Sequence, residues 1–126
     1  TCHARVLNYK GSLPPSHAYY LLYPQPYNLY CNLIDPPIPL FKIESFKGFL
    51  NWTMPHVEKG RPILIHCNSG TSRAPSLALV LLSKGQHLIT DESFEAARVE
   101  FMEKYLPVYE PGKGIEVFLR ENWKEI

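Results

Sequence analysis

The residues Ile65-His66-Cys67-Asn68-Ser69-Gly70-Thr71-Ser72-Arg73 join a short apolar run to a long apolar helical pattern. The run at 62–66 favours a buried parallel strand, and residues 74–84 predict a central helix that is apolar almost all round. A strand, a tight turn containing glycine and a helix start direct successive backbone N–H groups toward one point, where the helix adds its positive end. The stretch therefore predicts an α/β fold with an anion-binding loop at the end of a strand.

The remaining sequence predicts strands in the first third and helices after it. The patterns lie at 5–8 and 27–34 for strands, and at 45–57, 91–105 and 113–124 for helices. Pro55 is expected to kink or end its helix, and Thr90 is expected to be an N-cap. This order predicts a single α/β domain over residues 1–126, with a small parallel or mixed sheet flanked by helices.

Composition excludes several classes of protein. The net charge is +1 and no block of like charge occurs, so no nucleic-acid partner and no membrane partner is indicated. Apolar residues make up 45% of the chain, but no apolar run approaches the roughly 18 residues of a membrane span. Cys2, Cys31 and Cys67 form a poor disulfide framework, which favours a reducing, cytoplasmic location.

Cys67 lies where the donors of the predicted loop converge. A field that binds phosphate also lowers the pKa of a thiol, and a thiolate can attack phosphorus. Gly70 lets the loop curl, and Arg73 closes the ring because its planar fork can hold two phosphate oxygens. The other loop residues are small enough to leave the site open: Asn68, Ser69, Thr71 and Ser72. A lone cysteine or arginine usually has a structural role, so it is their combination in one loop that predicts a phosphate site.

A leaving oxygen needs a proton, which a carboxylic acid on a neighbouring loop can supply. The chain has only two aspartates, and a helix-dipole role explains Asp91. Asp35 follows the second predicted strand, in a loop stiffened by Pro36 and Pro37 that is of the type that overhangs the edge of a sheet. We therefore expect Asp35 to be a general acid, with an ordinary turn residue as the alternative.

His66-Cys67, five residues and Arg73 resemble the signature of the cysteine-based protein phosphatases, and the residues from Gly70 to Arg73 are similar to its dual-specificity branch. Four further segments are similar to compact bacterial members of that branch: 32–35, 93–96, 105–107 and 111–115. The resemblance covers most of the chain from about Tyr27 onward and implies a protein tyrosine phosphatase-like fold of the dual-specificity type.

The resemblance also implies roles for individual residues. Cys67 would be the nucleophile that forms a cysteinyl-phosphate, and Arg73 the phosphate clamp. Asp35 would protonate the leaving group and then accept a proton from water. His66 would orient the loop and help to keep the thiol ionised.

Further expectations concern ligands and substrates. The backbone of residues 68–73 and the Ser72 hydroxyl would line the phosphate pocket, without a metal or an organic cofactor. The partner would be a protein carrying phosphotyrosine, phosphoserine or phosphothreonine, or another phosphomonoester, and the enzyme would be a monomer. The tyrosines near the N-terminus either line a substrate groove or pack in a core: Tyr19, Tyr20, Tyr23, Tyr27 and Tyr30.

Ala74 departs from the family pattern, which usually has Ser or Thr there to stabilise the departing thiolate. This departure leaves two alternatives open: a phosphate-binding interaction module with slow turnover, and a glucan phosphatase, because such enzymes also carry Ala at this position. Cys31 either forms a protective disulfide with Cys67 on oxidation or packs in the core.

Overall fold

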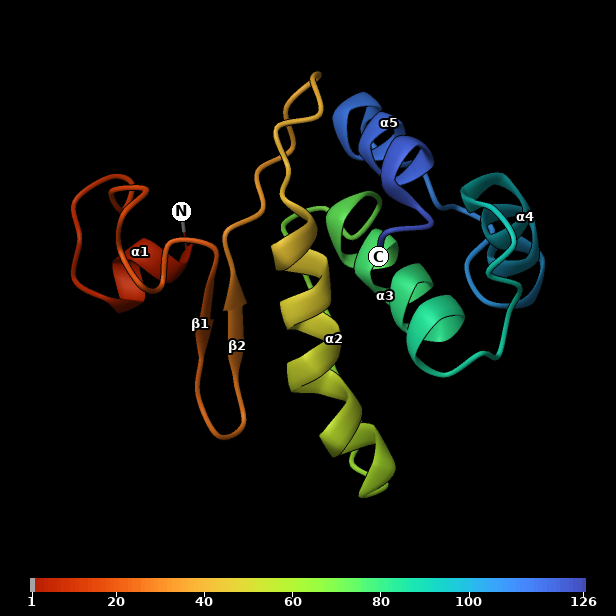
Figure 1. The fold of residues 1–126 in the computed structure, drawn as a ribbon, viewed down its shortest axis with the longest axis horizontal. Helices are drawn as coiled ribbons and strands as arrows, with labels where there is room; N and C mark the ends of the chain where they lie inside the picture. Colours follow the sequence, from red (N-terminus) through yellow and green to blue (C-terminus); the bar gives the residue numbers. More distant parts are fainter. Residues whose placement is uncertain (1) are drawn as a thin grey trace.

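The computed structural model describes residues 2–126, which form a small α/β fold (Figure 1). A short hairpin follows the N-terminal helix, and helices make up most of the remainder. In chain order the elements are α1 (Cys2–Val6), β1 (Leu22–Pro24), β2 (Leu29–Cys31), α2 (Ile43–Glu58), α3 (Arg73–Val80), the π-helical turn η1 (Leu81–Gly85), α4 (Phe94–Lys104) and α5 (Lys113–Asn122).

Helix α2 separates the two sides of the molecule. The β1–β2 hairpin lies on one side of it, and α3, α4 and α5 gather on the other (Figure 1). Aromatic rings connect the helices, since Phe46 of α2 stacks on Phe118 of α5 with ring centroids 5.3 Å apart. Leu79 and Val80 of α3 are fully buried in the same core. The core therefore fixes α3, whose N-terminus follows the cysteine loop.

The sheet differs from the expected parallel or mixed sheet. Within residues 2–126 it has two antiparallel strands, paired with Leu22 opposite Cys31 and Pro24 opposite Leu29. The expected strand at 27–34 shortens to β2, and its partner β1 lies in a tyrosine-rich stretch without a clear pattern. A turn hydrogen bond from Gln25 N–H to the Asn28 carbonyl closes the hairpin. Antiparallel pairing follows because so short a connection cannot return the chain in the parallel direction.

Two of the predicted strands are wrong. Residues 5–8 include the end of α1 and the turn after it, where Asn8 adopts a φ of 62°, and α1 buries His3 and Ala4 on one face. Residues 62–66 run without secondary structure into the cysteine loop, and Leu64 is 87% exposed. The apolar run predicted burial of both faces, whereas no neighbouring strand pairs with it in the described chain.

The four predicted helices are confirmed with shifted ends. Helix α2 continues through Pro55 to Glu58 and does not end at the proline. Helix α4 begins later than expected, and its N-cap is Ser93, whose hydroxyl accepts a hydrogen bond from Ala96 N–H, so the N-cap predicted at Thr90 is wrong. None of the helices described in residues 2–126 combines the length and the apolar character needed to cross a bilayer.

Substitution at two leucines tests the correction at 62–66. Leu79→Ala removes a fully buried side chain and should lower the free energy of unfolding by about 2–5 kcal/mol. Leu64→Ala truncates an exposed side chain and should change it by about 0.5 kcal/mol or less. Urea unfolding measures both values, and a loss at Leu64 comparable to that at Leu79 would show that 62–66 is a buried strand.

Candidate active site around Cys67

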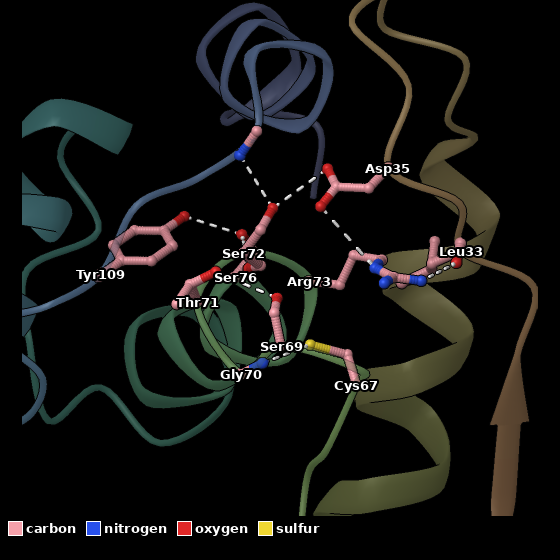
Figure 2. A network of polar contacts seen from close by, with 11 residues as sticks. Leu33, Asp35, Cys67, Ser69, Gly70, Thr71, Ser72, Arg73, Ser76 and Tyr109 are labelled. Atoms are coloured by element: carbon pink, nitrogen blue, oxygen red, sulfur yellow. Dashed lines mark hydrogen bonds and ion pairs between the residues drawn. The ribbon is translucent and has the colours of Figure 1, made fainter.

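The loop from Cys67 to Ser72 curls around the cysteine sulfur (Figure 2). Gly70 adopts a φ of 76°, a left-handed conformation that residues with a Cβ resist, and its N–H donates to Cys67 Sγ at 3.3 Å. The hydroxyls of Ser69 and Thr71 lie 3.1 Å apart and form a hydrogen bond within the loop. The glycine expected to curl the loop therefore also supplies a donor to the sulfur.

Several groups act on the Cys67 thiol. Burial alone would raise its pKa, but the backbone N–H groups of Ala74, Gly70 and Ser69 lower it, and the charge of Arg73 lowers it further. The net result is a pKa below the ordinary value of 9.0. Because the thiol is also half-buried rather than enclosed, it combines thiolate character with access for a reagent.

The Arg73 guanidinium is held against the loop that follows β2. Its Nη1 donates to the Leu33 carbonyl at 3.3 Å, and its Nε lies 3.9 Å from Asp35 Oδ2. The Nε is buried and has no hydrogen-bond partner among residues 2–126. Figure 2 shows the side chain directed toward Leu33 and not over the sulfur. Arg73 thus carries N–H capacity that its protein contacts do not use.

Asp35 reaches the cysteine loop through Ser72. The Ser72 hydroxyl donates to Asp35 Oδ1 at 3.2 Å and accepts a hydrogen bond from Gly112 N–H at 2.8 Å. Ser72 is only 4% exposed, and its hydroxyl points toward Asp35, away from the Cys67 sulfur (Figure 2). The two residues lie 37 positions apart in sequence, so the fold brings the predicted acid to the predicted phosphate loop.

A strap after α4, formed by residues 109–112, supports the loop. The hydroxyl of buried Tyr109 lies 2.8 Å from Ser76 Oγ, which donates to the Ser72 carbonyl at 2.7 Å. Glu110 N–H donates to the Thr71 carbonyl at 3.0 Å. Sequence reasoning did not assign these contacts, although a tyrosine beside the Pro111-Gly112 turn was a signal for a buried hydroxyl that needs a partner.

Several of the other predicted site residues are exposed. Asn68, Ser69 and Gly70 are exposed on the loop, where their backbone can face a ligand. His66 is also exposed, and among residues 2–126 no hydrogen bond reaches its ring, so the geometry gives it no orienting contact. Asp91 belongs to another region, where its carbonyl accepts a hydrogen bond from the Trp123 indole.

Cys31 lies in β2 and packs against the hydrophobic core. Burial raises the pKa of its thiol to about 12. Cys31 and Cys67 are both free thiols. The five tyrosines of the N-terminal third lie outside the buried core, which leaves the groove interpretation open.

The loop opens to solvent and is not enclosed in a deep cavity. A cavity of about 520 Å³ lies between the 60–65 segment and η1, and its lining does not include Cys67. In the described part of the chain no group of three or more His, Cys, Asp or Glu side chains could hold a metal ion. The groups gathered at the site are a thiol with a lowered pKa, backbone donors, a guanidinium and one carboxyl group.

The chain matches none of the protein-family models, curated proteins or solved structures with which it was compared. The proposal for its function therefore rests on the side chains around Cys67 and their geometry.

Alkylation tests the state of the Cys67 thiol. Because its pKa is lowered, its thiolate persists to lower pH, and the iodoacetamide reaction rate should have its midpoint below pH 9.0. Cys31 serves as an internal control, since its pKa of about 12 keeps it protonated and slow over the same range. Arg73→Ala removes a cation that acts on the thiol and should move the Cys67 midpoint upward. Arg61→Ala removes a cation that is not among the groups acting on the thiol and should leave the midpoint unchanged. Peptide mass spectrometry follows each cysteine, and equal midpoints for both would contradict the assignment.

Proposed function

We propose that the protein is a cysteine-dependent phosphatase that hydrolyses phosphomonoesters through a cysteinyl-phosphate intermediate. One observation carries the proposal: Cys67 Sγ accepts a hydrogen bond from Gly70 N–H, in a loop whose N–H groups and neighbouring Arg73 lower the pKa of the thiol and whose Ser72 binds Asp35. A structural cysteine has no need of such donors, and a pure anion site has no need of a cysteine. The fold proposed to house this site is of the protein tyrosine phosphatase-like, dual-specificity type.

In the first step the Cys67 thiolate attacks phosphorus. The S–P bond forms as the P–O bond to the leaving group breaks, and the Asp35 proton passes to the leaving oxygen. The N–H groups of residues 68–73 hold the phosphoryl oxygens, with the positive end of α3 behind them. Arg73, now bound to Leu33, turns its guanidinium to the phosphoryl oxygens when the substrate binds.

In the second step water attacks the phosphorus of the intermediate. The Asp35 carboxylate accepts a proton from that water, the S–P bond breaks, and inorganic phosphate and the thiolate are released. The same N–H groups that lower the thiol pKa stabilise the departing thiolate. No redox partner enters the balance, and neither a metal nor a cofactor is invoked.

Phosphorylated side chains of proteins are the proposed substrates. The cysteine loop lies at an open surface, where phosphotyrosine, phosphoserine or phosphothreonine can reach the sulfur. No lysine stands among loop residues 68–72 to match a multiply phosphorylated headgroup. The cytoplasm, where a thiolate stays reduced, is the proposed location.

Steady-state kinetics with p-nitrophenyl phosphate test the function. Cys67→Ser should abolish turnover, because it removes the nucleophile, whereas Cys31→Ser should retain it. Arg73→Lys should lower kcat/KM by about 10²–10³-fold through loss of transition-state charge stabilisation. Inorganic phosphate that binds at Cys67 without any turnover would instead support the interaction module. Preference for a phosphoglucan over phosphopeptides would support the glucan phosphatase.

Ala74→Ser tests the second step. The Ala74 side chain is buried beside the loop, and its backbone N–H helps to lower the pKa of the Cys67 thiol. An added hydroxyl should speed hydrolysis of the intermediate by about tenfold, the equivalent of one net hydrogen bond of ~1.4 kcal/mol. Stopped-flow burst kinetics separate this step from formation of the intermediate. An unchanged post-burst rate would show that the missing hydroxyl does not limit the enzyme.

A further inference from the structure

Two glycines at the start of α5 approach the loop that carries Asp35 so closely that no side chain fits between them. A Cβ on Gly112 would overlap Asp35 Oδ1 and lie 3.1 Å from Asp35 Cγ. A Cβ on Gly114 would overlap the carbonyl oxygens of Pro36 and Ile38. The Asp35 loop therefore rests directly on the backbone of this turn.

The backbone conformation does not explain these glycines. Gly112 has φ −57° and ψ 148°, which any residue adopts, and Gly114 lies inside α5 without a positive φ. Glycine inside a helix costs about 0.5–1 kcal/mol relative to alanine. Close approach to the Asp35 loop is the remaining reason for both positions.

The polar contacts between this turn and the Asp35 loop distinguish the two oxygens of the Asp35 carboxyl group. Ser72 has one hydroxyl proton, which it donates to Oδ1 while it accepts the Gly112 N–H. Because Oδ1 already accepts this bond, Oδ2 is the oxygen that carries the proton when Asp35 is protonated. Oδ2 is also the oxygen nearest Arg73, on the side of the cysteine loop (Figure 2).

We propose that Gly112 and Gly114 are positioning residues that seat the Asp35 loop, so that the protonated oxygen of the general acid faces the leaving group. The inference rests on the proposed phosphatase function and assigns a role to a turn that touches neither the sulfur nor the guanidinium. Alanine at either position displaces the Asp35 loop, and at Gly112 its Cβ also comes within 3.3 Å of Ser72 Oγ, the hydroxyl that binds Asp35. We expect the N–H groups around Cys67 to stay in place. The loss should therefore grow with the substrate's need for a proton on its leaving oxygen.

Two aryl phosphates with different leaving groups test this role. Phenyl phosphate releases a phenol that resembles the tyrosine side chain, with a pKa of about 10, and needs protonation, whereas 2,4-dinitrophenyl phosphate releases a much more acidic phenol. Gly112→Ala and Gly114→Ala should lower kcat/KM for phenyl phosphate by about 10²-fold, the cost of a displacement of about 1 Å, and far less for the dinitrophenyl ester. kcat/KM is the right quantity because it reports transition-state stabilisation relative to free enzyme and substrate.

A matched control and a double-mutant cycle make the test specific. A Cβ on Gly48 also meets a close neighbour, the Leu22 side chain on the hairpin side of α2, so Gly48→Ala should keep the wild-type ratio between the two esters. In an Asp35→Asn background, Gly112→Ala should have little further effect on phenyl phosphate, because both changes remove the same proton transfer. Ser72→Ala, which creates no overlap and leaves Oδ1 without its donor, should show the same selective loss if the glycine variants fail to fold.

Equal losses of kcat/KM for both esters, or losses that add fully to that of Asp35→Asn, would contradict the positioning role of Gly112 and Gly114. The phosphatase proposal would then still stand if turnover depends on Cys67. A wild-type protein that hydrolyses neither ester would overturn both.

Discussion

The backbone N–H groups directed at the Cys67 sulfur are the interaction on which the site depends. Burial disfavours a charged thiolate, and the donors from Gly70, Ser69 and Ala74, together with Arg73, outweigh that penalty. They can do so because Gly70 takes a left-handed conformation and because α3 begins directly after the loop. A field built from the main chain is fixed in place before a ligand arrives, so the proposed phosphoryl transfer would need little reorganisation.

The remainder of the fold holds this loop close to the carboxyl group of Asp35. The loop leads directly into buried α3, and the strap after α4 donates a hydrogen bond to it. Ser72 connects the loop to Asp35. The strap and the Asp35 loop come from opposite ends of the sequence and meet at Ser72. A change at a buried hydroxyl such as that of Tyr109 therefore reaches the candidate site through two hydrogen bonds.

Local patterns predicted the four later helices and the cysteine loop well, although they gave a strand where α1 ends. Apolar spacing found all four long helices, and the order Cys67, Gly70, Arg73 found a loop whose donors the structure brings to the sulfur. The sheet could not be predicted in this way. An apolar run such as 62–66 indicates that its side chains favour burial, but it does not indicate whether a second strand is present to pair with it. The hairpin strand β1 was missed because it depends on pairing with β2 and not on its own sequence. The close approach of Gly112 and Gly114 to the Asp35 loop joins residues far apart in the sequence, so no local pattern predicts it.

Direct observation of the phosphoenzyme tests the central claim most directly. Wild-type protein mixed with ³²P-labelled aryl phosphate and quenched in acid within milliseconds should carry the label, and peptide mapping should place it on the Cys67 sulfur. Release of labelled phosphate without any label on Cys67, or with the label on a serine or histidine, would contradict the account.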